Sequence, residues 1–189
     1  DRSDGVIAPN VAEGFAEFDR NTDILLDTRF GNSVGRFAGI RLTGSGSETD
    51  DLGITVSGTN GIRYFRDMRR GTSIPRVSFV ATEQGIGFAD FRHGIEGADL
   101  NGFRDSAGWS LPADIDGNAD GADTTALYAG AIGTARFDSE VSGDIVSTSG
   151  GINRLISNTD VHGDVVSGDA MNLLLVRGSL NSQVRVQGH

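Results

Sequence analysis

The last sixty residues alternate apolar and polar positions in a pattern that recurs about every 20 residues. Three rows, which start at Ala129, Ser149 and Ser167, align with one another. The pairs Ile132 and Ile152, Val141 and Val161, Gly143 and Gly163, and Ile145 and Val165 are each 20 positions apart, and the steps from Val161 to Leu180 and from Val165 to Val184 are 19. A fixed period of this length with short apolar stretches is typical of the coils of a parallel β-solenoid.

Each coil of such a solenoid consists of two or three short strands whose inward side chains fill a narrow core. The predicted core positions stack as ladders from one coil to the next: Val141, Ile145, Ile152 and Leu155, then Val161, Val165, Met171 and Leu174. Glycines, among them Gly143, Gly150, Gly151, Gly163 and Gly168, are predicted at or near the corners. One coil cannot bury its own apolar face, so the stability of a solenoid comes from stacking.

The first half follows the same pattern with a looser period. Strands are predicted within 35–43, 52–57, 60–65, 76–82 and 85–91, and the apolar positions Ile40 and Ile62, Leu52 and Ile74, and Ile62 and Ile86 are spaced by 22, 22 and 24. Residues 1–33 are the least regular, because Val11, Phe15 and Phe18 fit a helix and a strand almost equally well. We therefore expect an all-β chain with an N-terminal cap or irregular segment over 1–33 and one solenoid domain over 34–189.

Residues 104–125 interrupt the pattern with Trp109, Pro112 and a run of Asp and Gly, which predicts a long acidic loop that projects from the solenoid. In this loop Asp116, Asn118 and Asp120 stand at alternate positions before a glycine, as in the first half of a calcium-binding loop. The twelfth position is Leu127 rather than glutamate, so Asp123 or Asp114 would complete an open, weaker site. The expected cofactor is calcium; the alternative is a solvated acidic loop.

The charge changes the picture of partners. The 189 residues carry a formal net charge of −10, and all 16 basic residues are arginine. This charge disfavours nucleic acid and anionic membranes as partners and favours divalent cations. The chain has no cysteine, which excludes disulfides and thiolate sites, and it has no apolar run of the roughly 18 residues that a membrane helix needs. We expect an exported protein at the cell surface or outside the cell, present here as a processed piece that begins at Asp1.

Arginines gather between positions 63 and 76, a stretch that holds five of the 16. The candidate interaction patch consists of Arg63, Tyr64, Arg66, Arg69, Arg70 and Arg76. Guanidinium groups beside aromatic rings bind phosphate, sulfate, acidic polysaccharide or the acidic flank of another subunit. The alternative is a solvated strand face whose arginines pair with nearby aspartates such as Asp67.

Catalytic patterns are weak. The tripeptide Asn-Thr-Asp at 21–23 and 158–160 is similar to the acid-bearing motif of polygalacturonase-like enzymes, but the paired aspartate, the Gly-His-Gly and the lysine of those enzymes are missing in the required order. Asp90, His93 and Glu96 lie close in sequence, yet strand alternation places His93 on the other face. The histidines lack metal-ligand spacing. We therefore expect no enzyme.

The segment from Asp160 to Gly188, D-V-H-G-D-V-V-S-G-D-A-M-N-L-L-L-V-R-G-S-L-N-S-Q-V-R-V-Q-G, resembles the Gly-Asp-Val-rich repeats of very large secreted β-solenoid proteins of bacteria such as planctomycetes. The likeness covers about a third of the chain, from Tyr128 onward. The pattern is also faintly similar to bactofilin, a β-helix that polymerises end to end, from which the aspartate-rich loop departs. Both resemblances imply a structural or adhesive role and no catalytic residues.

The final predicted coil ends in V-R-V-Q-G-H with no polar cap after it, so Val184 and Val186 form a candidate assembly edge. An open coil is a template for another coil, and head-to-tail contacts that do not close produce a filament. We therefore expect a structural subunit of an extracellular bacterial assembly, such as a surface layer, fibre or filament, with itself as partner. The alternatives are a polysaccharide-binding solenoid and, after it, a polysaccharide lyase or hydrolase.

Overall fold

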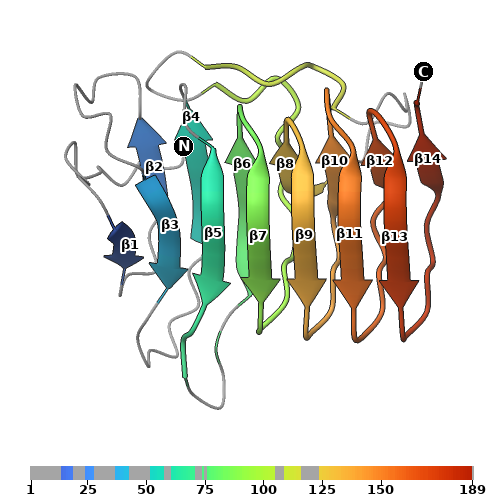
Figure 1. The fold of residues 1–189 in the computed structure, drawn as a ribbon, viewed down its shortest axis with the longest axis horizontal. Coiled ribbons are helices and arrows are strands. Elements are labelled where there is room, and N and C mark those ends of the chain that lie inside the picture. Colours follow the sequence, from blue (N-terminus) through green and yellow to red (C-terminus); the bar gives the residue numbers. More distant parts are fainter. Residues whose placement is uncertain are drawn as a thin grey trace.

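The computed structural model is built of stacked coils whose strands lie in two parallel sheets (Figure 1). It describes residues 14–18, 24–27, 37–42, 52–57, 61–70, 74, 76–104, 109–115 and 124–188. All elements assigned in these residues are strands. The prediction of an all-β solenoid with coils of about 20 residues is confirmed.

The strands alternate between the two sheets along the chain, so each coil contributes one strand to each sheet. Sheet A contains, in spatial order, β1 (Gly14–Phe18), β3 (Phe37–Leu42), β5 (Ile62–Asp67), β7 (Ile86–Phe91), β9 (Ile132–Phe137), β11 (Ile152–Ser157) and β13 (Met171–Val176). Sheet B contains β2 (Ile24–Asp27), β4 (Leu52–Ser57), β6 (Val77–Thr82), β8 (Thr125–Ala129), β10 (Asp144–Ser147), β12 (Val165–Ser167) and β14 (Val184–Val186).

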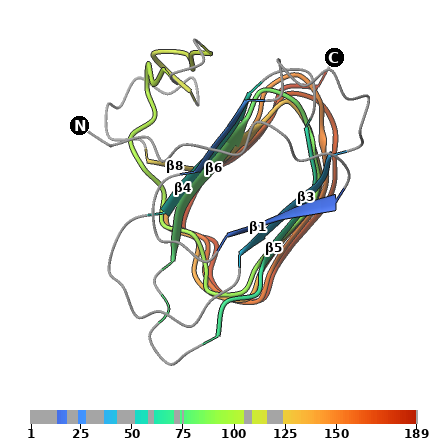
Figure 2. The same ribbon diagram turned by 90° about the vertical axis from the view of Figure 1, so that its left-hand side faces the viewer.

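From Val77 onward, a third, narrow ladder lies between the sheet A strand and the sheet B strand of the coils. It consists of single parallel bridges that run through Val77, Ile95, Val141, Val161 and Leu180. Viewed along the stack in Figure 2, the later coils, drawn from green to red, superimpose closely, whereas β1 lies apart from them. The coil is therefore a flattened loop with two broad faces and one narrow side.

The register predicted for the C-terminal coils is confirmed. Ile132 pairs with Ile152, Ile145 with Val165, and Val165 with Val184. Gly163 packs directly on Gly143: a Cβ atom there would lie 2.1 Å from the Gly143 carbonyl carbon. A constant sequence period thus indicates coils that stack directly on one another, because the backbone at each corner must fit the corner below it.

The register of the first half differs from the prediction. Ile40 pairs with Phe65 rather than with Ile62, and Leu52 pairs with Val77 rather than with Ile74. The pairing of Ile62 with Ile86 is confirmed. Spacing alone was ambiguous here, because the corners vary in length and several apolar residues compete for each rung.

The solenoid also begins earlier than expected. β1 pairs with β3 and β2 pairs with β4, both in parallel, so a first coil lies within the segment 1–33 that was assigned to a cap. Within 14–18 the strand alternative is correct. The boundary at residue 34 therefore does not mark the start of the sheets.

The interior is apolar from β3 to β12 in the described residues. Its largest members include the phenylalanines Phe65, Phe91 and Phe137, whose rings follow one another with centroids 4.7 and 5.1 Å apart. Phe91 and Phe137 share a rung and stack, whereas Phe65 shares its rung with Ala89 and its ring is tilted by 33° against that of Phe91. The aromatic ladder of this protein is thus internal and serves packing.

The residues inserted between β7 and β8 pack against the molecule rather than only projecting from it. An antiparallel bridge between Ala98 and Thr125 closes the insertion at its base. Leu100, Leu111 and Ile115 are buried in a second hydrophobic cluster on the outer face of sheet B, with Phe79 and Tyr128. The described part of the predicted loop 104–125 therefore covers sheet B, because sheet B presents apolar side chains there.

In the part of the chain that the structure describes, no helix is long and apolar enough to cross a membrane.

Candidate functional site

The last coil leaves the core uncovered at one end of the stack. It consists of β13, the bridge residue Leu180 and β14, which carry the same rungs as the coils before it. Ile145 and Val165 are fully buried, whereas their successor Val184 is 41% exposed and Val186 is 51% exposed. Leu180 is 38% exposed although Val141 and Val161 below it are buried. The residues of the predicted assembly edge, Val184 and Val186, therefore lie exposed in the last described coil.

Aspartate side chains form hydrogen bonds from one of the C-terminal coils to the backbone of the next. The Asp144 carboxylate accepts a hydrogen bond of 2.7 Å from the backbone N–H of Asp164. The Asp164 carboxylate in turn accepts one of 2.8 Å from the backbone N–H of Gln183. Asp160 accepts one of 2.6 Å from the N–H of Ser179. The aspartate of the Gly-Asp repeat thus bonds to backbone one coil further on, which gives the aspartate-rich composition a structural cause.

The predicted arginine patch separates into four places. Arg63, Tyr64 and Arg66 lie on β5 in sheet A. The Arg63 guanidinium lies 5.5 Å from the Tyr64 ring centroid, and Arg66 lies 5.8 Å from that of Phe88 on the neighbouring strand. Arg70 is exposed beyond the strand. Stacking on a ring holds a guanidinium flat while its N–H groups stay available to an anion.

Arg69 does not belong to an exposed patch. It is 4% exposed and forms a two-point ion pair with buried Asp67, with distances of 2.9 and 2.8 Å. Its backbone carbonyl also contacts His93 Nε2 at 3.0 Å. Arg69 thus pairs with Asp67, but the pair is buried and does not lie on a solvated strand face; a buried guanidinium requires a carboxylate.

Arg76 lies on the narrow side of the solenoid. It reaches past the coil of Gly94 and contacts Glu140 at 2.7 Å and the Ser142 hydroxyl at 3.0 Å. His162 Nε2 lies 3.4 Å from the other oxygen of Glu140. Arg76, Glu140, Ser142 and His162 thus connect successive coils through polar contacts. The Ser142 hydroxyl donates a hydrogen bond to the Glu140 carboxylate.

Charged residues of sheet A follow one row across its outer face. Arg66 is in register with Asp90, and Asp90 is in register with Arg136. Burial raises the pKa of Asp90 above its ordinary value of 3.8, and the charge of Asp138 adds to this, while Arg136, Arg92 and Arg66 oppose it. Asp138 itself pairs with Arg136 at 2.9 Å.

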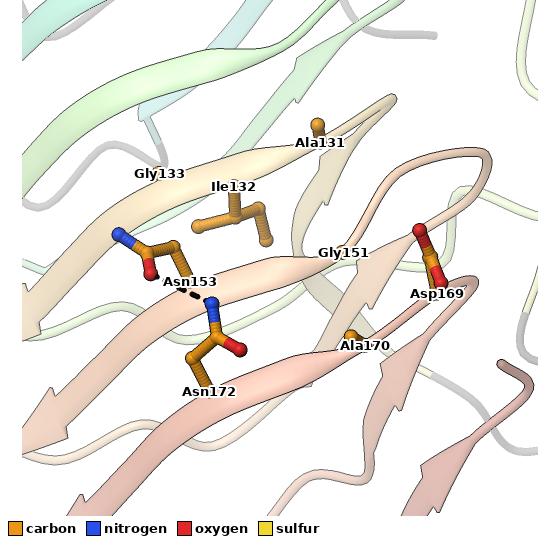
Figure 3. Close-up of a pocket in the computed structure, with 8 residues that line it drawn as sticks. All are labelled: Ala131, Ile132, Gly133, Gly151, Asn153, Asp169, Ala170 and Asn172. Carbon is orange, nitrogen blue, oxygen red and sulfur yellow. Dashed lines mark hydrogen bonds between the residues drawn. The ribbon is translucent and has the colours of Figure 1, made fainter.

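A shallow groove of about 370 Å³ lies at the corner before β9, β11 and β13 (Figure 3). Its floor contains Gly133, Gly151 and Ala170, and its polar wall consists of Asn153 and Asn172, whose amides are joined by a 3.0 Å hydrogen bond. The carboxylate of Asp169 stands at the rim. Sequence analysis missed this groove, although the residue after each aligned Ile or Met (Gly133, Asn153, Asn172) carried the signal.

The candidate calcium ligands Asp116, Asn118, Asp120 and Asp123 lie outside the described residues. Ile115, just before them, is buried, and its N–H donates to the Asn101 side chain at 3.2 Å. Among the described residues, no group of three or more His, Cys, Asp or Glu is placed to hold a metal ion. Calcium binding stays a prediction from the sequence.

Asp90, His93 and Glu96, considered as an acid–base cluster, occupy different sides of the coil. Asp90 belongs to β7, His93 contacts the Arg69 carbonyl, and Glu96 follows the bridge residue Ile95 on the narrow side. The fold thus distributes these three residues around a corner.

Comparison with known proteins adds no relative. No family model matches the chain, and neither the curated proteins nor the solved structures contain a significant match. The stacked parallel strands show a β-solenoid, and the resemblance to secreted bacterial solenoid proteins stays a prediction from the repeat pattern.

Proposed function

We propose that this protein is a structural subunit that assembles end to end through its solenoid coils. The observation that supports the proposal is the exposure of the last described coil: Val184 shares a rung with Ile145 and Val165, which are fully buried, and is itself 41% exposed. Burying an aliphatic side chain of this size contributes about 1.5–3 kcal/mol. An added coil would recover this free energy at several rungs at once.

The geometry of the open end selects its partner. β13 and β14 are edge strands of two parallel sheets, and Leu180 continues the third ladder between them. A partner must therefore offer parallel strands to two edges at once, around an apolar centre. A coil of a second copy has this shape, and β1 and β2 end the two sheets at the opposite end of the stack (Figure 1).

Such contact is heterologous, since one end of the stack binds the other end of the next copy. It does not close on itself unless the stack curves into a ring, so it produces a filament. The formal net charge of −10 opposes close approach of copies. Salt and divalent cations should promote assembly by screening this repulsion. We place the assembly outside a bacterial cell, as the resemblance to secreted repeats implies.

The test compares two substitutions in the same coil. Val184→Asp puts a charge on the open core, whereas Leu175→Asp puts one on a side chain of β13 that is also about 40% exposed but lies on the outer face. Sedimentation velocity over a range of concentration and salt, with electron microscopy, should show polymers for the wild type and Leu175→Asp. Val184→Asp should remain monomeric. A wild type that is monomeric under all these conditions contradicts the proposal, and so does a Val184→Asp variant that polymerises equally well.

A further inference from the structure

The outer face of sheet A is basic, although the protein as a whole is acidic. The outward positions of β3, β5, β7, β9 and β11 carry Arg41, Arg63, Arg66, Arg136 and Arg154 but only one carboxylate, that of Asp90. The whole chain has 26 acidic residues against 16 arginines. Charge of one sign is thus collected on one broad face, where it acts on a partner of opposite charge.

Three of these guanidinium groups face solvent without an ion pair in the described part of the chain. Arg63 and Arg66 contact aromatic rings, and Arg154 is exposed on β11. By contrast, Arg136 is paired with Asp138. The chain is rich in aspartate, yet no carboxylate of the described residues forms an ion pair with Arg63, Arg66 or Arg154.

Between Arg63 and the asparagine groove, the same face has a strip without large side chains. One in-register row crosses β5, β7, β9, β11 and β13. The residues that directly follow its members occupy equivalent places on these five successive strands: Arg63, Gly87, Gly133, Asn153 and Asn172. The two glycines are required by backbone packing, because a Cβ at Gly133 would lie 2.3 Å from the carbonyl oxygen of Gly87. Their consequence is an open path between Arg63 and the asparagine groove.

We infer that the outer face of sheet A binds a linear acidic polysaccharide that lies along the solenoid axis. Its carboxylate or sulfate groups contact Arg63, Arg66 and Arg154, and its hydroxyl groups contact Asn153 and Asn172. Five strands spaced by about 4.8 Å give a path of about 19 Å, which is long enough for several sugar units. Guanidinium groups supply charge, and the amides donate to and accept from hydroxyls.

The groove favours a polysaccharide over the acidic surface of a second copy. Paired asparagine amides beside a floor of Gly133, Gly151 and Ala170 leave room for a ring with several hydroxyls. A protein loop would need a large apolar anchor, and the lining of the groove offers none, because Ile132 is buried and the other apolar lining residues are alanines. The flat, regular spacing of the row also matches a polymer with a repeating unit.

The experiment uses the full chain with Val184→Asp, so that polymerisation does not add avidity. Binding to immobilised polygalacturonate, dextran sulfate and neutral dextran is measured by biolayer interferometry. The background protein should bind at least one acidic polymer, more weakly as salt rises, and should not bind neutral dextran. Polygalacturonate and dextran sulfate together distinguish a carboxylated from a sulfated ligand.

Two double variants test the assignment of residues. Arg63→Gln with Arg66→Gln should weaken binding about tenfold or more, since a hydrogen bond to a charged group contributes about 1.5–3 kcal/mol. Arg104→Gln with Arg177→Gln removes the same charge from exposed arginines outside the strands of sheet A and should change affinity less than about twofold. Asp169→Asn should tighten binding, because it removes a negative charge from the groove rim.

Three outcomes overturn the inference: no binding to either acidic polymer, equal loss in the two double variants, or unchanged affinity for Arg63→Gln with Arg66→Gln. A fourth is decisive in another way. If the Arg63 and Arg66 double variant, made without Val184→Asp, loses self-association in the absence of polysaccharide, the face is a contact between copies. Assembly through the last described coil is tested separately by Val184→Asp. The end-to-end proposal and the polysaccharide proposal can therefore fail independently.

Discussion

The coil of 132–147 and the coil of 171–186 have the same sequence pattern and opposite environments. Ile132, Val141 and Ile145 are buried to 1% exposure or less, whereas the corresponding Met171, Leu180 and Val184 are partly or largely exposed. The strands pair in the same register in both. The difference teaches that a rung residue of a solenoid becomes core only when a further coil covers it.

The largest expected effect comes from a charge on the same rung of the two coils. Val165→Asp buries an unpaired carboxylate and should destabilise the fold by about 4 kcal/mol or more, whereas Val184→Asp should cost less than about 1 kcal/mol. Urea unfolding followed by circular dichroism measures both. If Val165→Asp does not fold, Val165→Ala and Val184→Ala give a milder pair, with about 2 kcal/mol expected for the first. Equal losses at the two positions would show that the last coil is already covered.

Glycine at the corners provides a second pair. Gly163→Ala places a methyl group 2.1 Å from the Gly143 backbone, so the coils must separate, and we expect a loss of about 3 kcal/mol. Gly188→Ala meets nothing closer than 4.0 Å and should be neutral. Thermal unfolding of both variants is the measurement. A neutral Gly163→Ala would mean that the corner stack adapts more readily than a packed interior should.

The aspartate bonds between coils should contribute less. Asp144 is buried, and its loss in Asp144→Ala leaves the N–H of Asp164 without its acceptor, which should cost about 1–3 kcal/mol. Asp160→Ala removes an exposed bond of the same kind to Ser179, and water can replace it, so the cost should stay under about 1 kcal/mol. Chemical denaturation distinguishes the two, and a larger loss for Asp160 would reverse the assigned roles.

The smallest effect concerns pH. Because the pKa of Asp90 is raised in the folded protein, the folded state holds this proton to higher pH than the unfolded chain does. The free energy of unfolding therefore falls as pH rises from below 3.8 through the folded pKa, and the penalty persists above it. Asp90→Asn should remove this fall and be slightly more stable near pH 7, by less than about 1 kcal/mol after solvent screening. The free energy of unfolding is measured against pH for the wild type and for Asp90→Asn. Curves that run parallel from about pH 3 to 7 would contradict the raised pKa of Asp90.

The two outer faces of the solenoid differ as the two coils do. The outer face of sheet B presents Phe79, Tyr128, Val146 and Val166 and is covered by the insertion. Burial there raises the pKa of the Tyr128 phenol, which a hydrogen bond with Thr148 partly offsets. The outer face of sheet A presents arginine, asparagine and glycine, with Leu173 and Leu175 exposed on β13. Among the described residues, one face is thus covered by the chain itself and the other is exposed to solvent.

Much of the C-terminal architecture could be predicted from the sequence. The period that relates Ile132 to Ile152 and Val141 to Val161 is the period of the backbone, because identical rungs must stack in register. The first half could be predicted only in outline. Around Ile40, Leu52 and Ile74 several apolar residues have compatible spacings, and corners of unequal length remove the regularity that selects one register.

The candidate sites were less predictable, since they depend on which side of the coil a residue occupies. Five arginines between 63 and 76 look like one patch along the chain. In the structure Arg63 and Arg66 lie on sheet A, Arg69 is buried against Asp67, and Arg76 extends along the narrow side to Glu140. A corner between two of these positions changes the face, and a linear pattern does not contain the corner geometry.

The sequence by itself determined that this protein is a parallel β-solenoid and which residues of 129–188 share a rung, because periodic packing requires a periodic chain. Only the tertiary structure decided what each face does. The insertion covers sheet B since apolar side chains meet there, the arginines and the asparagine groove meet on sheet A, and the last coil exposes its core. Those contacts join residues of different coils, and their free energies depend on neighbours in space that the local pattern does not encode.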